Sequence, residues 1–246
     1  MKLRTDLQAV AACAGLFATT HGHATITAEH LLAALLTDET VKQIIAGVGG
    51  DVLALVSVTN RLLDSLDPRL QSAGFSPPVS AIDVLKRALL AVTETGAREL
   101  TPIDAFVALY GPPASRASQL LTSSGIERMR VLLFIEHGIA HDEDPSDVTP
   151  DTLPARDVTP STAVNAARKI VLHNDRYTTM EFIVEALQSF FDLGADDARR
   201  LMLAVHREGK ATVAVDAEAI AERRIATFLS HARAHGMPLL VTSEPA

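Results

Sequence analysis

Apolar residues recur every three or four positions through most of the first 140 residues. The first such run consists of Leu3, Leu7, Val10, Ala11, Ala14 and Phe17, a spacing that places them along one side of an amphipathic helix. Further helices are predicted over residues 52–66, 81–95 and 126–136. The pattern therefore predicts an all-α domain over residues 1–140.

The same region contains an internal duplication. Residues 22–36 align with residues 96–110 at a constant offset of 74 positions (96 − 22). In each copy a glycine ends one helix, and Thr27 or Thr101 caps the next. Pro102 lies in a first helical turn, where no backbone N–H is needed. Each copy then presents an apolar helical face that we expect the other copy to cover, formed by Leu31, Leu32, Leu35 and Leu36 in the first and by Ala105, Phe106, Leu109 and Tyr110 in the second.

Residues 141–162 interrupt this globular pattern. The stretch HDEDPSDVTPDTLPARDVTPST contains four prolines, six carboxylates and almost no large apolar side chain. Such a segment cannot bury enough apolar surface to offset the entropy lost when it is ordered. We expect an acidic, semi-extended linker that separates the first domain from a second one over residues 163–246.

Beyond the linker, short β-branched runs alternate with helical periods. Strands are predicted over residues 169–173, 211–215 and 238–242, and helices over residues 178–191, 196–208 and 217–234. Three short strands and three helices favour a small α/β sandwich. The expected fold is thus an all-α double-repeat domain followed by a small α/β domain.

Composition and charge narrow the possible functions. The 246 residues carry 22 Lys and Arg against 30 Asp and Glu, a net charge of −8 that argues against general nucleic-acid binding. The single cysteine, Cys13, excludes an intrachain disulfide and a cysteine-built zinc site. Thr5, Asp6 and Gln8 break the apolar run that an export signal requires, and no stretch reaches the length of a membrane span. We expect a cytoplasmic protein that does not enter membranes.

The sequence offers no recognisable catalytic motif. It has neither a G-x-x-x-x-G-K-[ST] phosphate loop nor a G-x-S-x-G nucleophile motif. His21, His23, Glu29 and His30 lie close together, but their spacing matches no zinc motif, so capping and surface roles are expected. We therefore predict no metal, no cofactor and no enzyme activity.

Two fragments of the second unit carry candidate chemistry. Asn174 and Asp175 follow the first predicted strand, where they either make a turn, with Thr178 capping the next helix, or contact a ligand. His206 lies on a mostly apolar helix and is either a structural hydrogen-bonding residue or a site residue. Each residue taken alone leaves both interpretations open.

Both units resemble components of Clp protein-unfolding machines. The segment HGHATITAEHLLAALLTD, its repeat and FIEHG at residues 134–138 resemble the double-repeat N-terminal domain of the ClpA unfoldase, without the ATPase modules of that family. The segments VLHNDRYTTMEFIVEALQSFF, LMLAVHREGKA and PLLVT at residues 238–242 resemble ClpS, an adaptor family. ClpS adaptors recognise N-terminal degradation signals (N-degrons) and hand them to a Clp unfoldase, so the resemblance implies a natural fusion of the two components.

The resemblance to ClpS implies a pocket for the first residue of a substrate protein. By position, Asn174, Asp175 and His206 would accept hydrogen bonds from its α-amino group, a cation with three donors at pH 7. The side-chain pocket would be lined by Thr178, Met180, Ile183, Met202, Val205 and Leu239. Met180 would also exclude β-branched side chains, so the expected first residues are Leu, Phe, Tyr and Trp.

The resemblance also implies a Clp AAA+ unfoldase as the partner. By position, it would dock on the helix that carries Glu218 and Arg224, although an ordinary solvated helix face is the alternative for these residues. The two units are further expected to dock on each other, since a tether raises their effective concentration.

Two positions depart from the ClpS pattern. Arg176 stands where an acidic residue is usual, and Thr179 stands where proline is usual. A cation near an ammonium site is expected to weaken binding or to favour substrates with an acidic second residue. Two hypotheses follow: an adaptor that delivers N-degron substrates, and a regulator or decoy that binds no N-degron and modulates Clp assembly through its docking surfaces.

Overall fold

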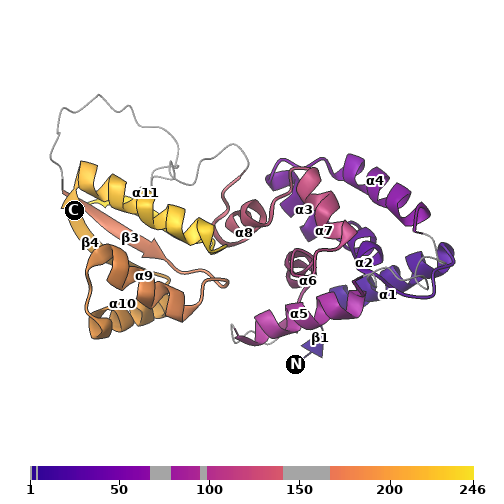
Figure 1. Ribbon diagram of the computed structural model, residues 1–246, viewed down its shortest axis with the longest axis horizontal. Coiled ribbons are helices and arrows are strands. Elements are labelled where there is room, and N and C mark those ends of the chain that lie inside the picture. The colour runs from indigo at the N-terminus through magenta and orange to yellow at the C-terminus, as the bar shows by residue number, and fades with distance from the viewer. Residues whose placement is uncertain (1, 4, 67–78, 95–98, 141–166) are drawn as a thin grey trace. The chain divides into compact units, whose positions relative to one another are not determined.

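The computed structural model describes residues 2–3, 5–66, 79–94, 99–140 and 167–246 (Figure 1). The chain divides into two compact units, Met1–Ile135 and Glu136–Ala246. The predicted linker, residues 141–162, lies outside the described residues.

The first unit is helical, as predicted. Its elements are β1 (Lys2–Leu3), α1 (Thr5–Thr20), α2 (Ala28–Leu35), α3 (Glu39–Gly47), α4 (Val52–Asp64), α5 (Ala81–Glu94), β2 (Glu99–Leu100), α6 (Pro102–Ala108), α7 (Arg116–Ser123) and α8 (Arg128–His137), whose last two residues belong to the second unit. The helices predicted over residues 52–66, 81–95 and 126–136 are confirmed to within two residues as α4, α5 and α8. The parallel pairing of β1 with β2 was not predicted, because a two-residue strand shows no period.

The two repeats cover each other's apolar faces. Helix α1 packs on α2 and helix α5 packs on α6, while α2 also contacts α5 and α6 across the repeat boundary. The predicted face residues of α2 and the neighbouring Leu36 are at most 3% exposed, and Phe106 is fully buried. The ring of Phe106 meets that of Tyr110 edge to face, with centroids 6.1 Å apart. The expectation that each copy needs its twin is therefore confirmed.

The same capping arrangement begins α2 and α6, but with different chemistry. In the second repeat, the Thr101 backbone N–H donates to Asp104 Oδ2 at 2.8 Å, and the Thr101 hydroxyl donates to the same atom at 2.6 Å. In the first repeat, the Thr27 backbone N–H donates to Nδ1 of His30 at 3.1 Å. The side chain three residues into the helix thus accepts from the cap residue in both copies.

A chain of histidine hydrogen bonds extends from this cap. Because Nδ1 of His30 accepts from Thr27, its proton lies on Nε2, which is 2.9 Å from Nδ1 of His23. Nε2 of His23 then donates to the Leu66 carbonyl oxygen at 2.9 Å. His30 is fully buried, and burial followed by the charges of His23 and His21 lowers its pKa from 6.5 to about 4.

Glu29 joins the repeats from the neighbouring position. Its side chain is 3% exposed, and Oε1 accepts the backbone N–H of Ala117, in the first turn of α7, at 3.3 Å. A carboxylate at a helix N-terminus is favourably placed for the helix dipole. The expected capping role of His30 is confirmed, but the expectation of surface positions is wrong for both Glu29 and His30.

The second unit is an α/β sandwich built on three antiparallel strands in the order β4-β3-β5. Its elements are β3 (Ala167–His173), α9 (Met180–Phe191), α10 (Ala195–Glu208), β4 (Lys210–Ala217), α11 (Glu218–Ala234) and β5 (Leu240–Pro245). All six predicted elements are present. The strands continue beyond the predicted apolar runs because backbone pairing continues to their ends, where Arg168 pairs with Pro245.

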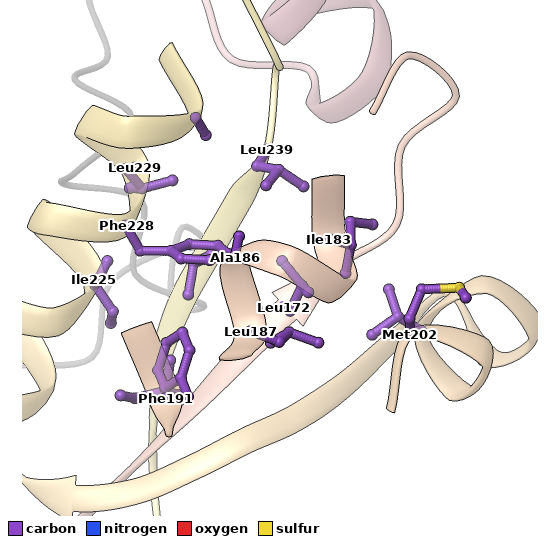
Figure 2. Packing of buried hydrophobic residues seen from close by; sticks show 14 of the residues in the cluster. Leu172, Ile183, Ala186, Leu187, Phe191, Met202, Ile225, Phe228, Leu229 and Leu239 are labelled. Atoms are coloured by element: carbon purple, nitrogen blue, oxygen red, sulfur yellow. The ribbon is translucent and has the colours of Figure 1, made fainter. Parts of the chain in front are cut away.

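Helices α9, α10 and α11 cover one face of this sheet. Ile170 and Leu172 of β3 alternate with Val171 and enter a single core cluster with side chains from all three helices. The Phe228 ring packs edge to face on Phe191, with centroids 5.4 Å apart, and Figure 2 shows both among the side chains of the cluster. This core fixes α9 and α10 against the end of β3, where the candidate residues lie.

We predict that His30 makes the first unit sensitive to acid. Its folded-state pKa lies below its unfolded value, so its contribution to stability is complete above pH 6.5 and is lost as the pH falls from 6.5 towards 4. His30→Asn keeps a side-chain acceptor for Thr27 without a titrating group, and should flatten the stability profile across that window. Denaturant unfolding of the full chain at a series of pH values measures this.

His206→Asn, at an exposed position, is the matched control and should leave the profile as in the wild type. Equal acid sensitivity in His30→Asn and the wild type would contradict the assignment.

Candidate functional site

The backbone brings the two candidate fragments together. The Asn174 N–H, one residue beyond β3, donates to the Gly209 carbonyl oxygen at 2.8 Å. Gly209 has φ +83° and ends α10, with its own N–H donating to the Val205 carbonyl oxygen at 2.9 Å. The turn after β3 is therefore joined to the last turn of α10, which carries His206.

Asp175 organises the turn itself. Its side chain is only 8% exposed, and Oδ1 accepts the backbone N–H groups of Tyr177 at 2.8 Å and Thr178 at 2.7 Å. Oδ2 accepts the Thr178 hydroxyl at 2.7 Å. Since a carboxylate oxygen has two lone pairs, Oδ2 retains capacity for one further donor.

Thr179, not Thr178, caps the following helix. The Thr179 hydroxyl accepts the Phe182 N–H at 3.3 Å, and α9 begins at Met180. The helix expected from residue 178 begins two residues later, and the alternative in which Thr178 caps it is wrong, because the Thr178 hydroxyl donates to Asp175. The departure from proline at position 179 thus supplies a side-chain cap that proline lacks.

His206 is exposed on the last turn of α10. Helical periodicity directs Met202 and Val205 inward, where they are 8% and 0% exposed, and turns His206 towards solvent. The imidazole is therefore accessible from solvent.

Four of the predicted apolar lining residues belong to one cluster. They are Ile183, Met202, Val205 and Leu239, none more than 8% exposed. Figure 2 shows Met202 at the margin of this cluster, with Ile183 between it and Leu239. Thr178 is half-buried, whereas Met180 is 42% exposed at the start of α9. Four of the predicted lining residues are therefore buried, whereas the thioether of Met180 is accessible to solvent.

Two further ionisable side chains, His173 and Arg176, lie next to the turn. His173 Nε2 lies 2.8 Å from the Thr242 hydroxyl, and burial, followed by the charges of His137 and Lys210, lowers the pKa of His173 against the opposing effect of Glu244. A neutral His173 adds no cation at neutral pH. The Arg176 guanidinium carbon lies 5.9 Å from the centre of the Tyr177 ring.

The predicted docking residues lie on α11. Glu218 is the first residue of the helix and is half-buried. Arg224 is ion-paired within the unit, with Nη1 3.3 Å from Asp216 Oδ2 and Nη2 3.8 Å from Asp192 Oδ2. Its guanidinium also lies 5.8 Å from the centre of the Phe191 ring, so Arg224 ties the end of α9 to α11.

The described ranges contain neither a cluster of metal ligands nor a single membrane-spanning helix. Within them, no group of three or more His, Cys, Asp or Glu side chains is arranged to hold a metal ion. In the same ranges no single helix is long and apolar enough to cross a membrane; only α3 and α4 taken together pass that test, and they are bent by 114°.

Two family models match the chain. The ATP-dependent Clp protease adaptor protein ClpS matches residues 165–242, and the Clp repeat (R) N-terminal domain matches residues 2–124. The ClpS adapter of Desulfatibacillum aliphaticivorans is 46% identical over 77 residues, which are 31% of this chain and 74% of that protein. The ClpS adapter of Escherichia coli O1:K1 is 45% identical over 78 residues, 32% of this chain and 74% of that protein.

A solved structure is also similar. Agrobacterium tumefaciens ClpS2 bound to L-phenylalaninamide is 35% identical, with a TM-score of 0.33; the match covers 33% of this chain and 99% of that one. The family models and relatives together show that this chain belongs to the ClpS family of Clp protease adaptors and carries a Clp repeat N-terminal domain ahead of its ClpS domain.

Proposed function

We propose that this chain is a non-catalytic adaptor that binds N-degrons with a hydrophobic first residue and delivers them to a Clp AAA+ unfoldase. Membership of the ClpS family supports the adaptor role. The proposed N-degron site is the turn at residues 174–178 together with the last turn of α10. Domain boundaries of 1–140 and 163–246, joined by a linker, fit the matched ranges.

One observation carries this proposal: the hydrogen bond from Asn174 N–H to the Gly209 carbonyl oxygen. It joins the turn that presents Asn174 and Asp175 to the helix end that presents His206. An amide oxygen, a carboxylate and an imidazole nitrogen can accept the three N–H groups of an α-ammonium. The negative charge of the carboxylate complements the positive charge of the ligand.

The apolar residues behind this rim would receive the first side chain of the substrate. Met202 can adapt to hydrophobic side chains of different shape, since methionine is flexible and polarisable. Burying a Leu or Phe side chain contributes about 1.5–3 kcal/mol. Micromolar affinity for a single N-degron is the expected result after binding costs.

The decoy hypothesis rests on the charge of Arg176. In this unit, Arg176 Nε and Glu136 Oε1 are 2.9 Å apart, so a carboxylate balances the cation beside the proposed ammonium site. This pairing favours a competent pocket over the decoy.

Delivery requires contact with an unfoldase. We propose that the surface of α11 near Glu218 and Arg224 makes this contact, with Arg224 also holding α9 in place through Asp192. Association of the two units of this chain stays a prediction, which small-angle scattering of the full chain can test.

A free amine should be essential for binding. We expect a fluorescent peptide that begins with Phe to bind the full chain with micromolar Kd, and its N-acetylated twin to bind at least roughly tenfold more weakly, since acetylation removes the charge and two donors. Asn174→Ala and His206→Ala should each weaken binding of the free peptide roughly tenfold, as measured by fluorescence anisotropy.

Asp196→Ala removes an acid that is 91% exposed on the first turn of α10 and serves as the control, with unchanged affinity expected. Equal binding of the free and acetylated peptides would overturn the proposal, and binding of neither would favour the decoy.

The exposed thioether of Met180 should act as the gate of the pocket. Met180→Ala opens space at the start of α9, and should raise the affinity for Ile- and Val-led peptides relative to the Phe-led peptide by roughly five- to tenfold. Competition titrations against the labelled Phe peptide give the ratio. Leu203→Ala removes another exposed apolar side chain, on α10, and should leave the ratio unchanged. A ratio that stays at the wild-type value in Met180→Ala would count against the gate.

A further inference from the structure

Arg176 holds a carboxylate with two of its donors. Its backbone N–H donates to Oε2 of Glu136 at 3.1 Å, and its Nε–H donates to Oε1 at 2.9 Å. Both oxygens of one carboxylate are thus bound by one residue, an arrangement that fits the planar geometry of the group. The Glu136 side chain is 8% exposed and that of Arg176 is 53% exposed, so the arginine remains accessible to solvent while it binds the Glu136 carboxylate.

The direction of the Arg176 N–H follows from the turn. Asp175 accepts the N–H groups of Tyr177 and Thr178, which draws those two inward around its carboxylate. Arg176 lies between Asp175 and Tyr177 in sequence, but its N–H donates to Glu136 instead. The turn therefore presents one backbone donor and one guanidinium to the same external carboxylate.

This carboxylate site adjoins the proposed amine site. Arg176 directly follows Asp175, and consecutive Cα atoms are about 3.8 Å apart. A polypeptide whose α-ammonium contacts Asp175 would have its second residue one such step from its first. The side chain of that residue would then lie within reach of Arg176, whereas the first side chain would point into the apolar cluster.

We propose that Arg176 selects N-degrons with an acidic second residue, and that Glu136 occupies the same donors within the chain until that residue displaces it. This inference rests on the proposed N-degron function and names the substrate class of its site. Aspartate or glutamate at the second position would replace the Glu136 carboxylate on the Arg176 N–H and Nε–H. A neutral second residue would leave the Glu136 pair in place.

The predicted preference is modest and depends on Glu136. In the wild type, the acidic residue exchanges one carboxylate for another, so the gain over a neutral residue should stay below about twofold. With Glu136 removed, the gain should reach about two- to fivefold, the range of partly exposed ion pairs. Added salt should reduce it.

The test uses the full chain and labelled peptides that begin Phe-Asp, Phe-Ser and Phe-Lys and are otherwise identical. We expect the ratio of Phe-Asp to Phe-Ser affinity to rise about two- to fivefold in Glu136→Gln relative to the wild type. The double variant Glu136→Gln with Arg176→Gln should return the ratio to one. The Phe-Lys peptide should be the weakest in Glu136→Gln.

Two matched variants control for general charge effects. Glu127→Gln removes an exposed acid just before α8, and Arg199→Gln removes a cation whose side chain is 66% exposed on α10. Both should keep the wild-type ratio. A Glu136→Gln ratio equal to that of the wild type, or a ratio that survives in the double variant, would overturn the inference while leaving the proposed function intact.

A second readout is independent of N-degron binding. The ¹⁵N–¹H signal of Arg176 Nε, assigned by its loss in Arg176→Gln, should shift in Glu136→Gln and shift back when N-acetyl-aspartate amide is added. If no peptide binds, the proposed function fails. The titration with N-acetyl-aspartate amide still shows whether Arg176 binds a carboxylate. A signal that does not move in either step would overturn the inference by itself.

Discussion

The buried carboxylate of Asp175 is the group on which the proposed site depends. It accepts three hydrogen bonds from Tyr177 and Thr178, and these bonds set the path of the chain between β3 and α9. If this carboxylate were removed, each buried donor would be left without an acceptor, which would cost about 1–3 kcal/mol of stability. The same carboxylate keeps one lone pair for a ligand. One group therefore both shapes the turn and supplies the charged acceptor. Its neighbours Asn174 and Arg176 are oriented by that turn, and a change at Asp175 would therefore disturb both.

The first unit shows how one local requirement is met in two ways. Thr27 and Thr101 both need an acceptor three residues later, and the two repeats supply His30 and Asp104. The histidine has a second nitrogen, which reaches His23 and through it the carbonyl oxygen of Leu66, just beyond α4. The aspartate offers no such donor. The duplication is therefore symmetric in its backbone but not in its side-chain chemistry, and the histidines of the first copy couple its cap to the residues just beyond α4.

Much of the fold could be predicted because it follows from short-range patterns. Helical periods located α4, α5 and α8, and the β-branched runs located all three strands of the second unit. The two-residue strands and the ends of β5 could not be predicted, since they depend on pairing with segments that are distant in sequence. For the site, turn residues and spacing indicated Asn174, Asp175 and His206, but the cap moved from Thr178 to Thr179 because a side-chain contact consumed the first hydroxyl. The partner of Arg176 is 40 residues away, a separation for which periodicity has no signal.

The charge on the rim depends on whether Arg176 has a partner. An isolated cation beside an ammonium site opposes binding, and that consideration favoured a decoy. A cation that already holds a carboxylate presents a nearly neutral pair instead, so the opposition largely disappears. Exchanging one carboxylate for another then costs little, because the guanidinium is never left without a partner. Selection for an acidic second residue thus arises from the Arg176 donors, and competition from Glu136 for the same donors limits its strength.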